Sequence, residues 1–150
     1  MNHSDSAVQA FLDGYNCAQA VAVAFSDLTG LSKDLSARMA SPFGGGMGRM
    51  REVCGAVSGM LMVAGILYGY DDPKATTAKR ELYAQVQTMA GQFREEMGSI
   101  ICRDLLKNPP ADPNPSPRTA EYYSSRPCAR MVETAARILD NYIEEHPIEK

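Results

Sequence analysis

Four cysteines, Cys17, Cys54, Cys102 and Cys128, are the residues of this chain with the most distinctive chemistry. Thiolates attack disulfides and bind soft metals, so a group of them can form a redox or metal site. In a reducing compartment cysteines stay unpaired unless they are catalytic or bind metal. We therefore expect all four to converge on one site, as catalytic thiols or as metal ligands, rather than to form a disulfide framework. The chain has no Cys-x-x-Cys pair, which argues against a thioredoxin-type motif and a zinc ribbon.

Three of these cysteines fall at predicted helix starts. Cys54 lies in the first turn of a helix that follows a glycine-rich loop, Cys102 opens a short helix, and Cys128 lies in the first turn of the last helix. Unpaired backbone N–H groups and the helix dipole stabilise an anion there, which lowers a thiol pKa. Cys17 differs, because the pattern predicts that it lies inside the first helix.

Hydrophobic periodicity predicts an all-α fold, a single-domain bundle of about five to six helices over residues 1–150. Ser6 has capping-box spacing with Gln9 and begins the first helix. The helices are expected over residues 6–28, 32–41, 51–69, 73–97, 102–107 and 125–146, with the long ones running up and down. Nothing in the pattern predicts a pair of strands. The two histidines, His3 and His146, are expected to be solvated near the chain ends.

A glycine-rich loop and a proline-rich loop separate these helices. Backbone amides of the first could cradle a phosphate beside Arg49 and Arg51, could donate to a cluster sulfur, or could simply form a tight turn. The cofactor-binding candidates are Gly44, Gly45, Gly46 and Gly55. Five prolines lie in the loop 109–117, and a loop of this length is often functional. At its end, Arg118, Tyr122, Tyr123 and Arg126 could cover the site near Cys128 and meet an anionic partner, but of the two we favour solvated loop residues.

Composition and charge exclude several classes of protein. The net charge is −3 and the basic residues are scattered, which argues against binding to nucleic acid. Residues 53–70 carry no charge, but this stretch is short and rich in glycine, so we expect a buried central helix and no membrane span. Its Gly55/Gly59 and Gly65/Gly69 pairs permit close helix packing within the chain or in a homodimer, and of these we favour the homodimer. The N-terminus has no signal-peptide pattern, which predicts a cytoplasmic location.

Five segments follow one another in the order of a known motif set: Gly14–Val21, Phe43–Arg49, Glu52–Gly59, Cys102–Leu106 and the helix begun by Cys128. Together they resemble the C-GCAxxG-C-C family of redox-active proteins, whose members are small and carry four characteristic cysteines. The resemblance implies that the four cysteines here are ligands or redox thiols. A related domain in split-Soret cytochromes is linked to an iron–sulfur centre as well as to haem. This chain lacks Cys-x-x-Cys-His, so haem attachment is not implied. The last family cysteine is usually followed by proline, whereas here Pro127 precedes it.

Three functions remain open at this point. The first is a cysteine-ligated iron–sulfur centre of the [2Fe-2S] type, for electron transfer or redox sensing. The second is thiol–disulfide chemistry without metal, in which Cys54 is the attacking thiol of low pKa. The third is a non-catalytic helical binding module with inert cysteines or a structural zinc. The sequence indicates neither a substrate nor a redox partner, and no acid–base constellation stands out.

Overall fold

The computed structural model describes residues 2–148, and its regular structure is helical. Across these residues it has nine α-helices, one short 3-10 helix and no β-strand, and a single isolated bridge pairs Val53 with Ile101. The elements are α1 (His3–Leu12), α2 (Cys17–Ala24), α3 (Ser26–Thr29), α4 (Lys33–Ala40), η1 (Ser41–Phe43), α5 (Gly55–Tyr68), α6 (Thr76–Met97), α7 (Cys102–Leu105), α8 (Ala120–Ser125) and α9 (Cys128–Glu145). The predicted all-α class is confirmed.

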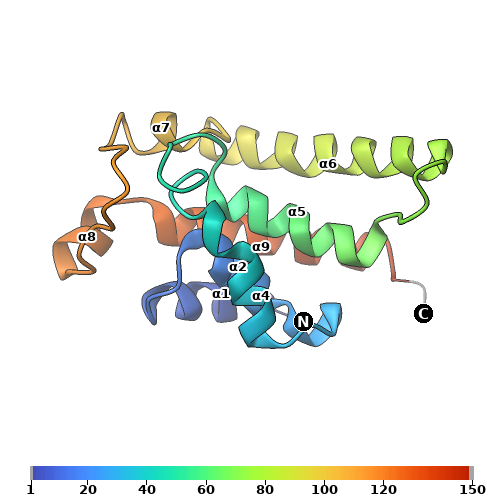
Figure 1. Cartoon of the computed structure of the whole chain (residues 1–150), viewed down its shortest axis with the longest axis horizontal. Coiled ribbons are helices and arrows are strands. Elements are labelled where there is room, and N and C mark those ends of the chain that lie inside the picture. The colour runs from blue at the N-terminus through green and yellow to red at the C-terminus, as the bar shows by residue number, and fades with distance from the viewer. Residues whose placement is uncertain (1, 149–150) are drawn as a thin grey trace.

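The three long helices α5, α6 and α9 form the body of the bundle and alternate in direction along the chain (Figure 1). α6 packs along α5 and α9, while α1 and α2 cover the other side, where α1 contacts α9 and α2 contacts α5. α5 begins directly after the glycine-rich loop, and α9 begins beside α8 at the same end of the molecule (Figure 1). The starts of several helices therefore meet at one end of the bundle.

The core follows from the helical spacing of apolar residues. α9 buries Met131, Val132, Ala135, Ile138, Leu139 and Tyr142, which is the face that the sequence predicts. α5 is apolar nearly all round, and it buries Val57 and Met60 between its neighbours. α6 buries Met89 and Phe93 in its second half only.

The structure has more helices than the sequence predicts, in part because the single helix expected over residues 6–28 is divided into three, α1, α2 and α3. Gly14 has a φ of 114°, which ends α1 after Leu12 and turns the chain. Asn16 then caps α2: its side chain accepts from the backbone N–H of Gln19, whose side chain accepts from the N–H of Asn16. The predicted capping box at Ser6 was wrong, since Asn2 caps α1.

Two other boundaries also differ. α6 begins at Thr76 rather than at Pro73, and α8 forms inside the segment that was expected to remain a loop. In α8 the Thr119 hydroxyl accepts from the backbone N–H of Tyr122, a capping contact that starts the helix.

His3 is buried rather than solvated. Its Nδ1 lies 2.6 Å from Asp140 Oδ1, its Nε2 lies 3.0 Å from Asp27 Oδ2, and its ring stacks on Phe25. The side chain is about 5% exposed, so these contacts replace most of its hydration. They fasten α1 to α3 and α9.

The Gly55/Gly59 pair of α5 provides close packing within the chain. A Cβ at Gly59 would lie 2.6 Å from the Ala18 carbonyl oxygen, and one at Gly55 would lie 2.9 Å from the Phe43 carbonyl oxygen. Because a Cβ does not fit at either distance, α2 and the glycine loop can approach α5 only where glycine stands. No helix within residues 2–148 is both long and apolar enough to cross a membrane.

Candidate cysteine site

All four cysteines line one small cavity of about 40 Å³. Cys54, Cys102 and Cys128 are buried and Cys17 is half-buried. They come from four separate elements, and successive cysteines are 26 to 48 positions apart in the sequence, so only the folded bundle brings them together.

Every one of these cysteines stands at the start of a helix. Cys17, Cys102 and Cys128 are the first residues of α2, α7 and α9, and Cys54 is the N-cap of α5. The predicted helix-start positions of the last three are confirmed. The prediction that Cys17 lies inside a helix was wrong, because the break before Asn16 makes it the first residue of α2. Four helix starts therefore meet at the cysteine cavity, although the N–H groups of the short α7 already donate to main-chain carbonyls.

A short antiparallel contact holds Cys54 and Cys102 in place. The Cys54 N–H donates to the Ile100 carbonyl at 2.7 Å, and the Cys102 N–H donates to the Glu52 carbonyl at 2.6 Å. The Glu52 carboxylate pairs with Arg103 at 2.6 Å. The segment before α5 and the segment before α7 are therefore fixed to each other beside the cavity.

The glycine loop approaches the site in an unusual conformation. Five successive residues, Gly45 to Arg49, have φ between 57° and 69°, and Arg51 has a φ of 63°. A Cβ at Gly46 would lie 2.7 Å from the Cys102 Cβ, so the backbone can reach this cysteine only as glycine. Gly45, Gly46 and Gly55 line the cysteine cavity, whereas Gly44 lines a wider cavity beside it.

Cys17 and Cys128 form a hydrogen-bonded pair, and this bond shifts the pKa values of the two thiols in opposite directions. The hydrogen bond to Cys17 lowers the pKa of Cys128, and three guanidinium groups, those of Arg126, Arg118 and Arg51, lower it further. The same hydrogen bond, together with burial, raises the pKa of Cys17 well above its ordinary value. Cys128 is thus the sulfur that carries negative charge most readily, and Cys17 is its proton donor.

Cys54 has the opposite character. Burial raises its pKa to about 12, although backbone N–H groups of Ala56 and Val57 act in the other direction. Its thiol contacts the Met131 sulfur at 3.6 Å. The prediction that Cys54 is the attacking thiol of low pKa was therefore wrong: the desolvation of a fully buried sulfur outweighs the helix start. Burial also raises the pKa of Cys102, while Arg51, whose Nη1 lies 3.6 Å from its Sγ, opposes this.

A family comparison agrees with this geometry. A family model described as "Putative redox-active protein (C_GCAxxG_C_C)" matches residues 15–142, which include all four cysteines. The chain belongs to the C_GCAxxG_C_C family. No match was found among curated proteins or among solved structures.

In this C_GCAxxG_C_C protein the side chains around the cysteines are not arranged for a single metal ion. Within residues 2–148 no three or more Cys, His, Asp or Glu side chains are grouped so that they could hold one ion. A structural zinc needs four ligands at about 2.0–2.3 Å from one point. The Cys17 thiol is hydrogen-bonded to Cys128, whereas Cys54 and Cys102 are linked only through the backbone that precedes their helices.

Arginine and tyrosine side chains from the segment before α9 cover the cysteine cavity. Arg118 donates to the Phe11 and Tyr15 carbonyls at 3.2 and 3.0 Å, and its guanidinium lies 4.9 Å from the ring centre of Tyr122. Arg118 and Tyr122 line the cysteine cavity, so the expectation that they are solvated was wrong. Their closeness to Cys128 in sequence was the available signal, but a loop pattern does not reveal burial.

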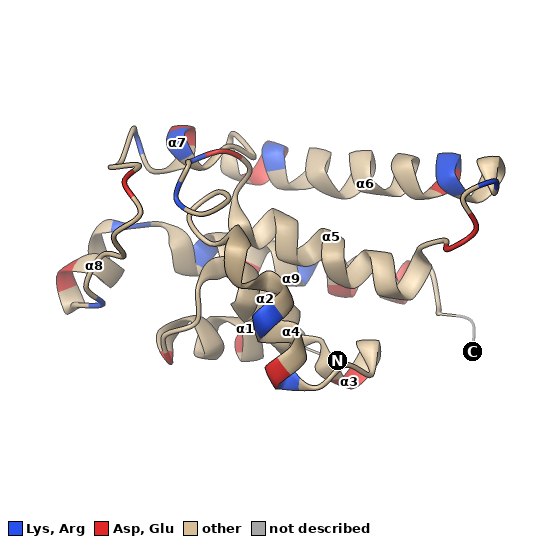
Figure 2. Cartoon of the chain, in the orientation of Figure 1, with Lys and Arg blue, Asp and Glu red and all other residues tan. Residues whose placement is uncertain are grey.

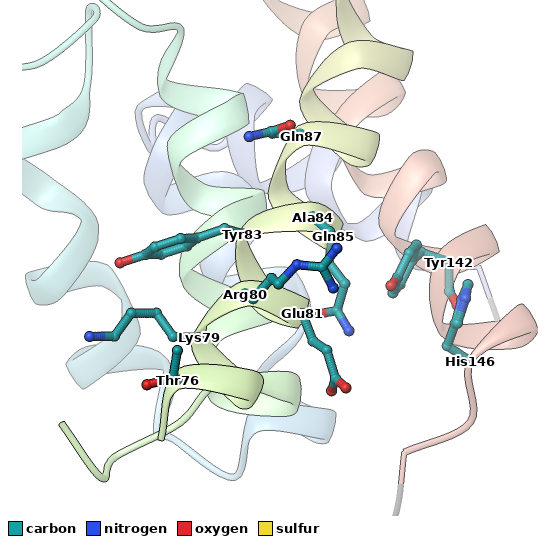
Figure 3. A pocket seen from close by; sticks show the side chains of 10 residues that line it. All are labelled: Thr76, Lys79, Arg80, Glu81, Tyr83, Ala84, Gln85, Gln87, Tyr142 and His146. Carbon is teal, nitrogen blue, oxygen red and sulfur yellow. The ribbon is translucent and has the colours of Figure 1, made fainter. Parts of the chain in front are cut away.

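A cavity of about 710 Å³ lies at the far end of the molecule and is unrelated to the family motif. It lies between α6 and the end of α9, with Tyr142 on α9 and His146 just after it facing Arg80 and Glu81 on α6 (Figure 3). It is open to solvent and no cysteine lines it. The four cysteines therefore lie at the other end of the molecule, where the helix starts meet.

Proposed function

We propose that this protein is an electron-transfer or redox-sensing protein, and that Cys17, Cys54, Cys102 and Cys128 hold a two-iron iron–sulfur cluster. One observation carries the proposal: all four cysteines, each at a helix start, line a single small cavity, and three of them are buried. Four cysteine thiolates are the usual ligand set of such a cluster. The family's description as redox-active is consistent with this use.

The residues present fit such a centre in three respects. Cys17 and Cys128 would supply the two protein sulfurs of one iron, and Cys54 and Cys102, which line the same cavity, those of the other. Arg51 contacts the Cys102 sulfur and offsets the negative charge that four thiolates would bring. Gly46 and Gly55 leave room beside Cys102 and Cys17, which allows the backbone to lie against the sulfurs. The cluster, when bound, supplies one-electron transfer, and this chain supplies the thiolates and excludes water by burial.

Replacement of single cysteines tests this assignment. We expect anaerobically prepared wild-type protein to show the visible absorption of an iron–sulfur cluster, and each Cys→Ser variant to lose or shift that spectrum. Met131→Leu is the matched control, because Met131 contacts the Cys54 sulfur but would not bind iron. A wild-type spectrum without cluster absorption would overturn the proposal.

A second function is favoured by the Cys17–Cys128 pair alone. Here the Cys128 thiolate attacks a disulfide of a redox partner and releases one partner thiolate. Cys17 then loses its proton, attacks the Cys128 sulfur and releases the second thiolate. The products are a Cys17–Cys128 disulfide and a partner reduced to two thiols. Hydrogen bonding between the two sulfurs and the lowered pKa of Cys128 support these roles.

Thiol trapping of the metal-free protein tests this second function. We expect mild oxidation to link Cys17 to Cys128, which mass spectrometry of alkylated peptides would detect. Cys54→Ser should leave this link intact and Cys17→Ser should abolish it. Oxidised protein in which Cys17 and Cys128 both remain free would contradict it.

A further inference from the structure

A second cavity, of about 420 Å³, opens beside the cysteine site and is lined by four arginines. These are Arg49 and Arg51 from the glycine loop, and Arg118 and Arg126 from the segments on either side of α8. The proline-rich loop supplies part of the opposite wall, and no aspartate or glutamate lines the cavity. Three of the arginines, all except Arg49, also line the cysteine cavity, so the two cavities adjoin.

None of these four guanidinium groups forms an ion pair with a carboxylate in residues 2–148. Their partners are neutral. Arg51 Nε donates to the Pro110 carbonyl at 2.9 Å, Arg118 donates to main-chain carbonyls, and Arg126 lies 3.4 Å from the Ser116 hydroxyl. The one nearby carboxylate, that of Asp112, has its pKa lowered in part by Arg49, but it is exposed and stands outside the cavity lining.

Arg51 is a buried cation without a counter-ion, and the half-buried Arg49 has one buried nitrogen without a partner. Arg51 is only 4% exposed, and its neighbours offer just a carbonyl oxygen and the Cys102 sulfur. The Nη1 of Arg49 is buried and has no hydrogen-bond partner. Burying a cation without a counter-ion is costly, and nearly all buried polar groups in folded proteins are hydrogen-bonded.

The arginine cluster is a local feature rather than a property of the whole surface. The chain has 18 acidic against 15 basic residues. Figure 2 shows basic positions on the glycine loop, beside α8 and at the start of α9, and others on α4, α6 and α7, so the cluster is defined by the four arginines that line the cavity. A concentrated positive site on an acidic protein indicates selection for an anionic ligand at that place.

We propose that this cavity binds a small molecule that carries phosphate or carboxylate groups, and that it holds this anion directly against the cysteine site. Guanidinium groups bind both kinds of oxyanion through paired hydrogen bonds, which explains why arginine rather than lysine lines the cavity. The cavity volume lies within the roughly 300–1,000 Å³ that small-ligand sites occupy. The inference rests on the arginines and the cavity, and it holds whether the cysteines bind a cluster or exchange disulfides.

Calorimetric titration of the full chain at an ionic strength of about 0.1 M, where the Debye length is about 10 Å, tests the inference, with inorganic phosphate and malonate as separate probes. We expect one site per chain for at least one probe, and the tighter of the two identifies the class of ligand. Because a hydrogen bond to a charged group contributes enough to change affinity about tenfold or more, Arg49→Gln and Arg126→Gln should each weaken binding by about that factor.

The matched control is Arg80→Gln, which removes the same charge from α6 beside the distant cavity shown in Figure 3. It should leave the affinity unchanged within a factor of about two, since exposed charges farther than a Debye length contribute little. Circular dichroism of each variant establishes that it is folded. If one of the two cavity variants does not fold, the other still tests the inference. Failure of both probes to bind wild-type protein, or equal weakening by Arg80→Gln, would overturn the inference.

Discussion

The Cys17 thiol and the Cys128 sulfur share a hydrogen bond across the starts of α2 and α9. The two residues stand 111 positions apart in the sequence, since 128 minus 17 is 111. This hydrogen bond raises the pKa of Cys17 and lowers the pKa of Cys128. Three arginines lower the pKa of Cys128 further. Cys128, rather than Cys54, is therefore the cysteine whose pKa lies below its ordinary value.

Removing the Cys17 thiol should raise the pKa of Cys128. The hydrogen bond lowers that pKa, so in metal-free Cys17→Ala less Cys128 is ionised at any pH near neutrality. Ultraviolet thiolate absorbance followed against pH would show the Cys128 transition move to higher pH. The matched variant Cys54→Ala removes a sulfur that does not donate to Cys128, and it should leave the transition almost in place. An unchanged transition in Cys17→Ala would contradict the assignment of donor and acceptor.

Alkaline pH should destabilise the metal-free protein through Cys54. Its pKa is raised from 9.0 to about 12, so its contribution to stability is complete below pH 9 and is lost as pH rises toward 12. In this window an unfolded chain releases one more proton, which lowers the free energy of unfolding by about 1.4 kcal/mol per pH unit. Denaturant titrations between pH 9 and 11 would show this slope, and Cys54→Ala should flatten it. Equal slopes in the two proteins would mean that Cys54 is not buried as a neutral thiol.

Alanine at Gly46 should disturb the site, whereas alanine at Gly48 should not. Both glycines have positive φ, 69° and 57°, so alanine costs about 1–2 kcal/mol of backbone strain at either position. Only at Gly46 would the new Cβ also meet Cys102, at 2.7 Å; at Gly48 the nearest atom is 3.8 Å away. We expect Gly46→Ala to lower the free energy of unfolding by at least about 1 kcal/mol more than Gly48→Ala. Equal losses would show that the loop does not press on Cys102.

The buried His3 cluster should matter for stability and not for redox chemistry. His3→Ala removes hydrogen bonds to Asp27 and Asp140 and leaves the half-buried Asp140 carboxylate without this partner. A loss of about 2–3 kcal/mol in the free energy of unfolding is expected. His146→Ala removes an exposed imidazole that stacks on Tyr142, and should cost well under half as much. Comparable losses from the two variants would contradict the anchoring role of His3.

The fold class could be predicted because apolar spacing in α6 and α9 is regular over many turns. The break at Gly14–Asn16 could not, since alanine-rich sequence on both sides continues the helical pattern and only the Asn16–Gln19 contact marks the restart. The helix-start positions of Cys54, Cys102 and Cys128 could be predicted, whereas that of Cys17 could not, because the break before Asn16 was not recognised. The cysteine with the lowered pKa could not be predicted from the sequence, because the burial of Cys54 and the arginines around Cys128 arise only in the folded molecule. The arginine cavity was hidden for the same reason, as its four residues come from segments 67 or more positions apart, counting from Arg51 to Arg118.

The iron and acid-labile sulfide content of protein purified without oxygen tests the central claim most directly. The account predicts about two irons and two sulfides per chain. It also predicts that both are lost when Cys54 or Cys128 is replaced by serine and are retained in Met131→Leu. Wild-type protein free of iron and sulfide would contradict the cluster and leave the Cys17–Cys128 pair as the redox centre.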